Sequence, residues 1–179
     1  MSRAFVKESD DDFSADDVPA IKDPLPTGVK NYMTPEGAER LKRELDDLVN
    51  TEHPRLAAKL KRDMHDKKEE VGKNRRLLRE MERRIEYLTT MVERIEVVYP
   101  HQQNTDQVLF GARVTVLENA RKKRSYTIVG IDESNPSEGR ISWISPIARS
   151  LLSKGLGDTV RLNLPGGKKI LKILGIEYR

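Results

Sequence analysis

The stretch that decides the fold spans residues 71–95 and reads VGKNRRLLREMERRIEYLTTMVERI. Its core-type side chains recur at alternating steps of three and four over more than three heptads. The seam that they form consists of Val71, Asn74, Leu78, Met81, Ile85, Leu88, Val92 and Ile95. A repeat of this kind predicts one helix of a coiled coil, with Asn74 as its polar member. Such a helix needs a partner that carries a matching apolar stripe.

The partner helix is predicted immediately before this stretch. Thr34 can cap a helix that starts at Pro35, and Glu36 suits the positive end of its dipole. One apolar stripe then runs to about Asp63, with a bend expected at Pro54. The stripe consists of Leu41, Leu45, Leu48, Leu56 and Leu60. Since only a few residues separate the two helices, we expect an antiparallel hairpin roughly 45 Å long.

After residue 106 the apolar pattern changes to the period of two that is typical of strands. Strands are predicted at residues 113–117, 126–131, 140–144, 160–164 and 170–176. A turn is expected at 119–124, which includes the basic run 121–124. A Ser-Pro pair at Ser145 opens a short helix that reaches Leu152. The chain is therefore predicted to be α+β, a long helical hairpin followed by a small antiparallel α+β domain.

Composition agrees with an elongated part beside a smaller cored part, because 35% of the 179 residues are charged and only 36% are apolar. Residues 1–30 hold four basic and seven acidic side chains and are predicted to be a disordered leader. The hairpin is assigned to 31–98, a linker to 99–106 and the second domain to 107–179. The absence of cysteine excludes thiolate sites and disulfides. It suits a cytoplasmic protein, and no run is apolar enough for a secretory signal or a membrane span.

Several motifs, in order, carry a family resemblance over nearly the whole chain from residue 31. They are MTPEG at 33–37, REMERRIEYL at 79–88, FGARVTV at 110–116, YTIVG at 126–130, GRISWISPIAR at 139–149, GD at 157–158 and PGG at 165–167. In these motifs the chain resembles the bacterial GreA/GreB family of transcript-cleavage factors, and its first residues are similar to those of GreB-like members.

The resemblance implies a hairpin that enters the secondary channel of bacterial RNA polymerase and an FKBP-like domain that docks at the channel rim. In that family, acidic residues at the hairpin tip help to hold the second catalytic Mg²⁺ of the polymerase, which then cleaves backtracked RNA. Oxygen ligands and a second metal ion suit phosphodiester hydrolysis. The factor itself would have no complete active site, so we expect no enzyme and no cofactor beyond Mg²⁺ shared with the polymerase.

The tip of this chain departs from the family. Relatives read Gly-Asp-x-Ser-Glu-Asn-Ala there, whereas residues 62–71 read RDMHDKKEEV, in a hairpin about four residues shorter by our alignment. The remaining candidate carboxylates are Asp63, Asp66, Glu69 and Glu70. Asp66 and Glu69 also fit a capping box, which would occupy Asp66 with backbone N–H groups. Residues 59–79 hold nine basic and four acidic side chains, and this excess of positive charge opposes the binding of a cation. The tip therefore predicts weak or absent cleavage; the alternative is an ordinary cleavage factor that uses these carboxylates.

The basic residues near the tip have two interpretations. They could contact phosphates of nascent RNA or template, as a basic patch does in the family, or they could be the solvated faces of a charged coiled coil. The candidates for nucleic-acid contact are Lys61, Arg62, Lys67, Lys68, Lys73, Arg75 and Arg76.

The segment after residue 144 is the candidate surface for polymerase binding, because the resemblance places the start of this short helix at the channel entrance. The candidates are Ser145, Pro146, Ile147 and Arg149, with Ser145, Pro146 and Arg149 expected outward and the aliphatic side chains inward. We expect a monomer. Two rival functions stay open, a purely structural hairpin that dimerises and a prolyl isomerase. An isomerase needs an aromatic-lined cleft, and the sequence does not indicate one, because its aromatic residues are scattered over Phe110, Tyr126, Trp143 and Tyr178.

Overall fold

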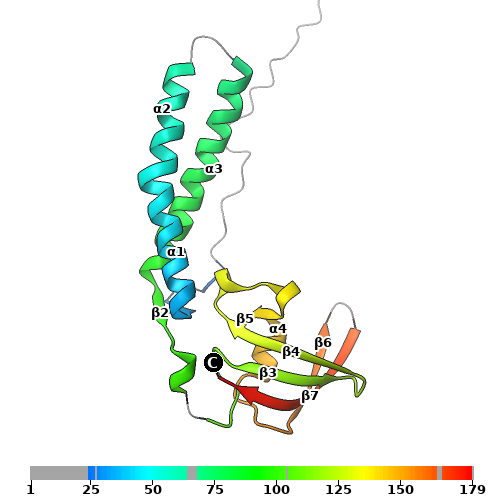
Figure 1. The fold of residues 1–179 in the computed structure, drawn as a ribbon. Coiled ribbons are helices and arrows are strands. Elements are labelled where there is room, and N and C mark those ends of the chain that lie inside the picture. The colour runs from blue at the N-terminus through cyan, green and yellow to red at the C-terminus, as the bar shows by residue number, and fades with distance from the viewer. Residues whose placement is uncertain (1–23, 27, 64–67, 104, 165–166, 179) are drawn as a thin grey trace, which may run out of the picture.

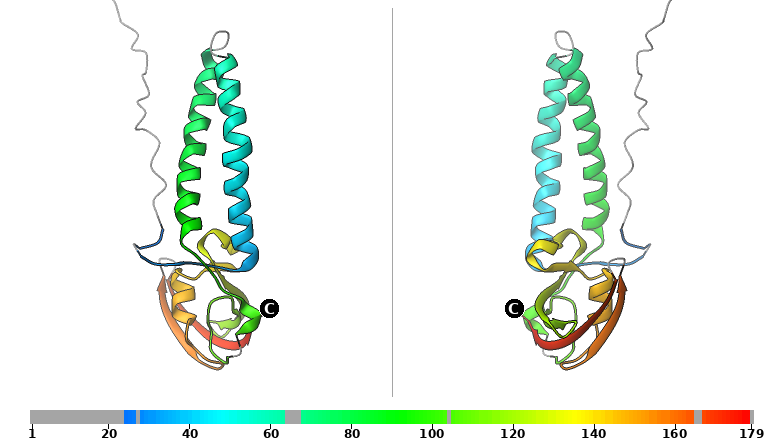
Figure 2. Two further views of the ribbon diagram at one scale, coloured as in Figure 1. Left: turned by 90° about the vertical axis from the view of Figure 1, so that its left-hand side faces the viewer. Right: turned by 90° about the vertical axis from the view of Figure 1, so that its right-hand side faces the viewer.

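The computed structural model describes residues 24–178 apart from 27, 64–67, 104 and 165–166. Two helical arms stand beside each other and rise from one end of a curled sheet domain, as Figures 1 and 2 show. No helix within the described residues is long and apolar enough to cross a membrane. The α+β architecture predicted from the sequence is confirmed.

The first arm of the hairpin is not one regular helix. It consists of α1 (Pro35–Asp47), a π-helical turn (Leu48–Glu52) and α2 (His53–Asp63). The predicted cap is present, because the Thr34 side chain accepts a hydrogen bond from the Gly37 N–H at 3.1 Å. The irregularity expected at Pro54 takes the form of the wide π turn just ahead of it, where the His53 N–H bonds to the Leu48 carbonyl.

The second arm is α3 (Lys68–Glu93), which runs antiparallel to the first (Figure 1). Val71, Asn74 and Leu88 are buried in the seam as predicted. Beyond Leu88, Val92 is partly buried against the cluster that contains Leu88, and the fully buried residue beside it, Met91, was not predicted.

The base of the hairpin is closed by a short parallel pair of strands that sequence analysis missed. Strand β1 (Asn31–Met33) pairs with β2 (Ile95–Val97), so Ile95 belongs to a strand and not to the helical seam. Leu25 and Met33 are also buried there, in a cluster with Leu88 and Met91. The packed part of the chain therefore starts ahead of the predicted boundary at residue 31.

The second domain is built on a five-stranded sheet with the strand order β5-β4-β3-β7-β6. Its strands are β3 (Arg113–Glu118), β4 (Lys122–Val129), β5 (Arg140–Ser142), β6 (Thr159–Leu164) and β7 (Gly167–Glu177). The prediction of a purely antiparallel sheet is wrong at one edge, since β5 runs parallel to β4. Two short helical turns, Ile131–Glu133 and Pro136–Glu138, bring the chain back so that β5 starts in the direction of β4.

Helix α4 (Pro146–Leu151) packs on this sheet as predicted, and the Ser145 side chain caps it by accepting from the Ala148 N–H at 3.2 Å. The turn predicted at 119–124 is shorter than expected. Asn119 and Ala120 make it with positive φ angles of 50° and 56°, and β4 already starts at Lys122. Beneath α4 lies the core of the sheet domain. It consists of Val108, Ala112, Val114, Val116, Ile128, Ile141, Ala148, Leu151, Val160, Leu162, Leu171 and Ile173.

Candidate functional site

The hairpin tip lies between the end of α2 and the start of α3. Asp66 and Lys67 lie outside the described residues, and for Asp63 and Lys68 only the helical backbone is described. The possible capping box at Asp66 is therefore outside the described part of the chain. Lys61 and Arg62 are exposed in the last turn of α2. Positively charged side chains are favourable there because they lie at the negative end of the helix dipole.

The two described tip carboxylates are both paired with lysines. Glu69 accepts a hydrogen bond from Lys73 at 2.7 Å, one helical turn further along α3. Glu70 accepts one from Lys59 at 2.9 Å, across the two arms. Within the described ranges, no group of three or more His, Asp or Glu side chains is arranged to hold a metal ion. The described tip residues therefore do not form a ready-made Mg²⁺ site.

The basic candidates divide into paired and unpaired residues. Lys73 pairs with Glu69, and Arg76 pairs with Glu80 at 3.1 Å, each with the i,i+4 spacing that is common on exposed helix faces. Lys61, Arg62 and Arg75 are exposed and, among the described side chains, form no ion pair. These three are available for phosphates.

The start of α4 shows how the polymerase-binding candidates lie. Pro146 and Arg149 are exposed as expected, and Ile147 is half-buried against the core of the sheet domain. Ser145 differs from the expectation of an outward side chain, because it is half-buried and its hydroxyl is used as the helix cap. The freely accessible part of this surface is therefore made by Pro146 and Arg149.

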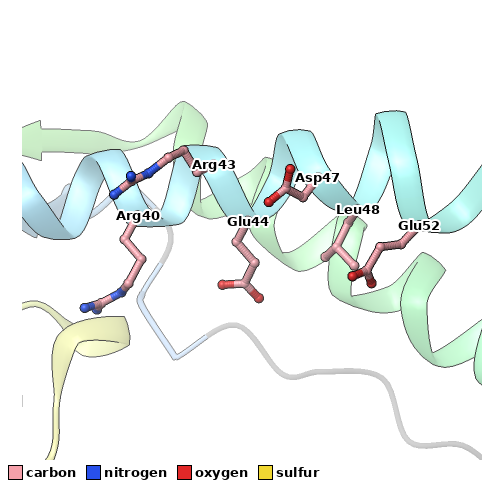
Figure 3. A pocket seen from close by; sticks show the side chains of 6 residues that line it. All are labelled: Arg40, Arg43, Glu44, Asp47, Leu48 and Glu52. Carbon is pink, nitrogen blue, oxygen red and sulfur yellow. The ribbon is translucent and has the colours of Figure 1, made fainter.

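A charged groove along the first arm was not predicted from the sequence. Figure 3 shows its lining side chains, which follow α1 and the π turn. They are Arg40, Arg43, Glu44, Asp47, Leu48 and Glu52, around a volume of about 590 Å³. Glu44 is already paired with Arg84 of α3 at 2.7 Å. Small-molecule pockets are mostly apolar and enclosed, so this open charged groove does not have the character of one.

A buried carboxylate joins the hairpin to the sheet domain, and sequence analysis missed it. Glu133 lies on the turn between β4 and β5 and is only 4% exposed. Its Oε2 accepts hydrogen bonds from the backbone N–H groups of Thr34 at 3.1 Å and Gly130 at 3.0 Å. The Thr34 hydroxyl donates to its Oε1. The carboxylate thus lies at the N-terminus of α1, where the helix dipole favours a negative charge. Only the fold brings residues 34 and 133 together, so no local motif could have revealed it.

A second carboxylate cluster belongs to the sheet alone. Glu118 is 8% exposed and bonds to Lys169 and Arg124, both at 2.7 Å. The hydrogen bond from Lys169, with the two positive charges, holds the pKa of the Glu118 carboxyl below its usual value of 4.5, although burial acts in the opposite direction. This cluster ties β3 to β4 and β7 and stabilises the sheet.

The aromatic residues of the sheet domain are used in packing. The rings of Trp143 and Phe110 lie 5.5 and 6.3 Å from that of Tyr32 at the hairpin base. The Tyr178 hydroxyl donates to the Gln107 carbonyl and accepts from the Leu109 N–H. These contacts give the isomerase alternative no support.

Comparison with known proteins places both parts of the chain. Residues 31–97 match the family model described as transcription elongation factor, N-terminal, and residues 90–178 match transcription elongation factor, GreA/GreB, C-term. The chain is 41% identical over 160 residues to transcription elongation factor GreB of Neisseria meningitidis, covering 86% of this chain and 98% of the relative. It is 38% identical over 154 residues to transcription elongation factor GreA of Nautilia profundicola, covering 83% and 95%.

Among solved structures, GreA factor homolog 1 of Thermus thermophilus aligns with 20% identity and a TM-score of 0.39, over 83% of this chain and 99% of that one. A GreA/GreB factor from Nitrosomonas europaea gives the same identity and TM-score. Family membership rests on the sequence matches.

Proposed function

This chain belongs to the GreA/GreB family of transcription elongation factors, and from that premise we propose that it binds bacterial RNA polymerase through the secondary channel. In this proposal the hairpin occupies the channel and modulates elongation, with little or no stimulation of transcript cleavage. The factor is an accessory protein of the cytoplasm without an active site of its own. Any Mg²⁺ involved would belong to the polymerase.

The state of the tip carboxylates is the observation that carries the proposal. Glu69 and Glu70 each face a lysine ammonium group, at 2.7 and 2.9 Å. A carboxylate already shared with a cation is a weaker ligand for a second cation, and exposed cations flank the tip at Lys61, Arg62 and Arg75. A tip with this charge balance suits contact with phosphate groups better than delivery of a metal ion.

Docking is assigned to the exposed start of α4. Pro146 and Arg149 are the accessible side chains, while Ile147 anchors the helix to the core and Ser145 fixes its first turn. The surface is therefore held rigidly by the sheet domain, as a recognition surface needs to be. Arg149 can pair with an acidic group of the polymerase, and Pro146 offers a pre-ordered apolar contact.

The proposal is tested with a purified elongation complex that has backtracked, at fixed Mg²⁺, with and without the protein. We expect the labelled protein to bind the polymerase, which is measured as a shift in its electrophoretic mobility on a native gel. We expect no rise in the rate of RNA cleavage. Efficient Mg²⁺-dependent cleavage would refute the proposed inactivity of the tip. Absence of any binding would refute the function as a whole.

The ordinary cleavage activity is the second candidate, favoured by 41% identity to a GreB over 98% of that protein's length. In this case tip carboxylates, Asp63 and Asp66 or Glu69 and Glu70, fill the acidic role. If the parent stimulates cleavage, a double variant, Asp63→Asn with Asp66→Asn, identifies the pair that serves the metal, because it abolishes cleavage only if that pair is Asp63 and Asp66. The matched control is Asp46→Asn with Asp47→Asn, which changes the same number of charges on the first arm away from the tip.

A further inference from the structure

We propose that Glu133 is a positioning residue, which holds the hairpin at one angle to the sheet domain and so sets where the tip lies when α4 is docked. The consequence for polymerase binding rests on the proposed function. Its structural part concerns the free protein alone and is tested separately.

The contacts of Glu133 reach across the junction between the two parts of the molecule. One oxygen, Oε2, binds the backbone N–H of Thr34 on the hairpin side and that of Gly130 on the sheet side. The other oxygen accepts from the Thr34 hydroxyl, which in turn accepts from the Gly37 N–H at 3.1 Å. Hydrogen bonds to a charged acceptor are strong and directional. The carboxylate therefore fixes the first turn of α1 in direction as well as in distance.

The same short turn also contacts the other arm. The hydroxyl of Tyr87, near the end of α3, donates to Asp132 Oδ1 at 2.9 Å. Arg40 of α1 donates to the Asp132 carbonyl at 3.1 Å. The turn Ile131–Glu133 therefore binds both arms of the hairpin at their base. The three hairpin side chains that it binds are those of Thr34, Arg40 and Tyr87. Two arms held by one turn resist rotation in a way that a single contact does not.

The apolar contacts of the junction do not define the angle by themselves. Trp143, Ile144 and Ile131 pack against the hairpin cluster around Met33 and Met91. Apolar burial gives attraction without a fixed direction, so these residues keep the two parts together but allow small rotations. The hydrogen bonds of Asp132 to Arg40 and Tyr87 add direction but lie nearer the surface. The hydrogen bonds of Glu133 supply the stronger constraint, because a rotation would leave the carboxylate and N–H groups unpaired inside the junction.

Small rotations matter because the hairpin is a long arm. Helix α3 has 26 residues, which at about 1.5 Å each gives an arm of about 39 Å. A rotation of about 10° at its base moves the far end by about 7 Å. The angle at the junction therefore decides whether the tip reaches its target.

The test uses the absence of native cysteine, so that two introduced cysteines carry spin labels without further changes. Arg75→Cys on α3 and Lys123→Cys on β4 place exposed labels on the two parts of the molecule. The label-to-label distance is measured by pulsed electron paramagnetic resonance in the full chain. We expect Glu133→Ala to broaden the distance distribution by about 5 Å, because Arg75 lies about 27 Å from the base of α3 and a rotation of about 10° moves it by that amount. Glu133→Gln, which keeps the shape and a bonding oxygen, should restore a narrow distribution.

Glu138→Ala is the matched control, because it removes an exposed glutamate from the neighbouring turn, where its carboxylate pairs with Arg140 at 3.3 Å. A distribution as narrow in Glu133→Ala as in the parent would overturn the proposal, and so would equal broadening in the control. If Glu133→Ala does not fold, Glu133→Asp replaces it, since its carboxylate is one methylene too short to reach Thr34 and Gly130 together. An unchanged distance in Glu133→Asp would likewise overturn the proposal.

The functional consequence is measured on the polymerase complex. We expect Glu133→Ala to compete with a cleaving Gre factor about tenfold less well than the parent, because only about a tenth of its molecules would hold the hairpin at the binding angle, with Glu138→Ala unchanged. Undiminished competition by a variant with a broadened distance would refute the link from angle to function. If the parent does not bind polymerase at all, the proposed function fails while the distance measurement still decides the role of Glu133.

Discussion

Replacing Gly37 by alanine is predicted to destabilise this protein, against the usual rule for helices. Alanine in a helix interior is ordinarily more stable than glycine by about 1 kcal/mol. Gly37 lies in the first turn of α1 and is buried. A Cβ atom added there would lie 2.6 Å from Glu133 Cγ and closer still to the carboxylate. The glutamate has to move, and at 4% exposure it has no solvent to move into.

The magnitude follows from the contacts that the movement breaks. The displaced carboxylate loses hydrogen bonds from Thr34 and Gly130 inside the junction. A hydrogen bond to a charged group contributes about 1.5–3 kcal/mol, so losing one or two outweighs the helix gain of about 1 kcal/mol. We therefore expect Gly37→Ala to lower the free energy of unfolding by about 1–3 kcal/mol.

The matched control is Gly72→Ala on α3, where an added Cβ meets nothing within 4 Å. This variant should raise the free energy of unfolding by about 0.5–1 kcal/mol. Both are measured by urea denaturation followed by far-ultraviolet circular dichroism. If Gly37→Ala is as stable as the parent, or gains stability as Gly72→Ala does, the Glu133 carboxylate is not held where the structure places it, and the account of the junction is wrong.

Three further outcomes are expected. Because the folded pKa of Glu118 lies below 4.5, its stabilising contribution is present at neutral pH and is lost as the pH falls below about 4.5 through the folded value. Glu118→Gln should therefore be less stable than the parent at pH 7. The difference in stability should shrink in acid when thermal unfolding is followed against pH. Leu88→Ala removes a fully buried seam residue and should cost about 2–5 kcal/mol in urea denaturation, whereas the same change at the exposed Leu77 should cost far less. Pro146→Ala should weaken polymerase binding in a titration without lowering the melting temperature, and an unchanged affinity would speak against the α4 surface.

The parts of the fold that could be predicted are those with a long, regular pattern. The seam from Val71 to Leu88 repeats over many turns, and the Ser145 cap has a clear local signature. The three-residue strands β1 and β2 have no periodicity to detect, and their pairing depends on contacts between residues 31 and 95 that a local pattern does not contain. Met91 is the fully buried residue near the end of α3, in a cluster with Met33 of β1 and Leu41 of α1, whereas Val92 packs partly buried against that cluster.

The candidate site was predictable to a smaller degree. Residue type and position identified the exposed Pro146 and Arg149, but the pairing of Glu70 with Lys59 depends on the register between the two arms. Glu133 is one of many acidic residues in the sequence, and nothing near it distinguishes it. Its importance comes from burial and from two partners more than ninety residues away, Thr34 and Gly37, which only the folded chain brings together.

A competition titration tests whether this protein occupies the secondary channel without stimulating cleavage. A backtracked elongation complex is mixed with a fixed amount of a cleaving Gre factor, and increasing amounts of this protein are added while RNA cleavage is followed. The account predicts that cleavage falls towards the factor-free rate, with a midpoint that rises in proportion to the amount of the cleaving factor. Cleavage that stays constant would contradict binding in the secondary channel, and cleavage that increases would contradict an inactive tip.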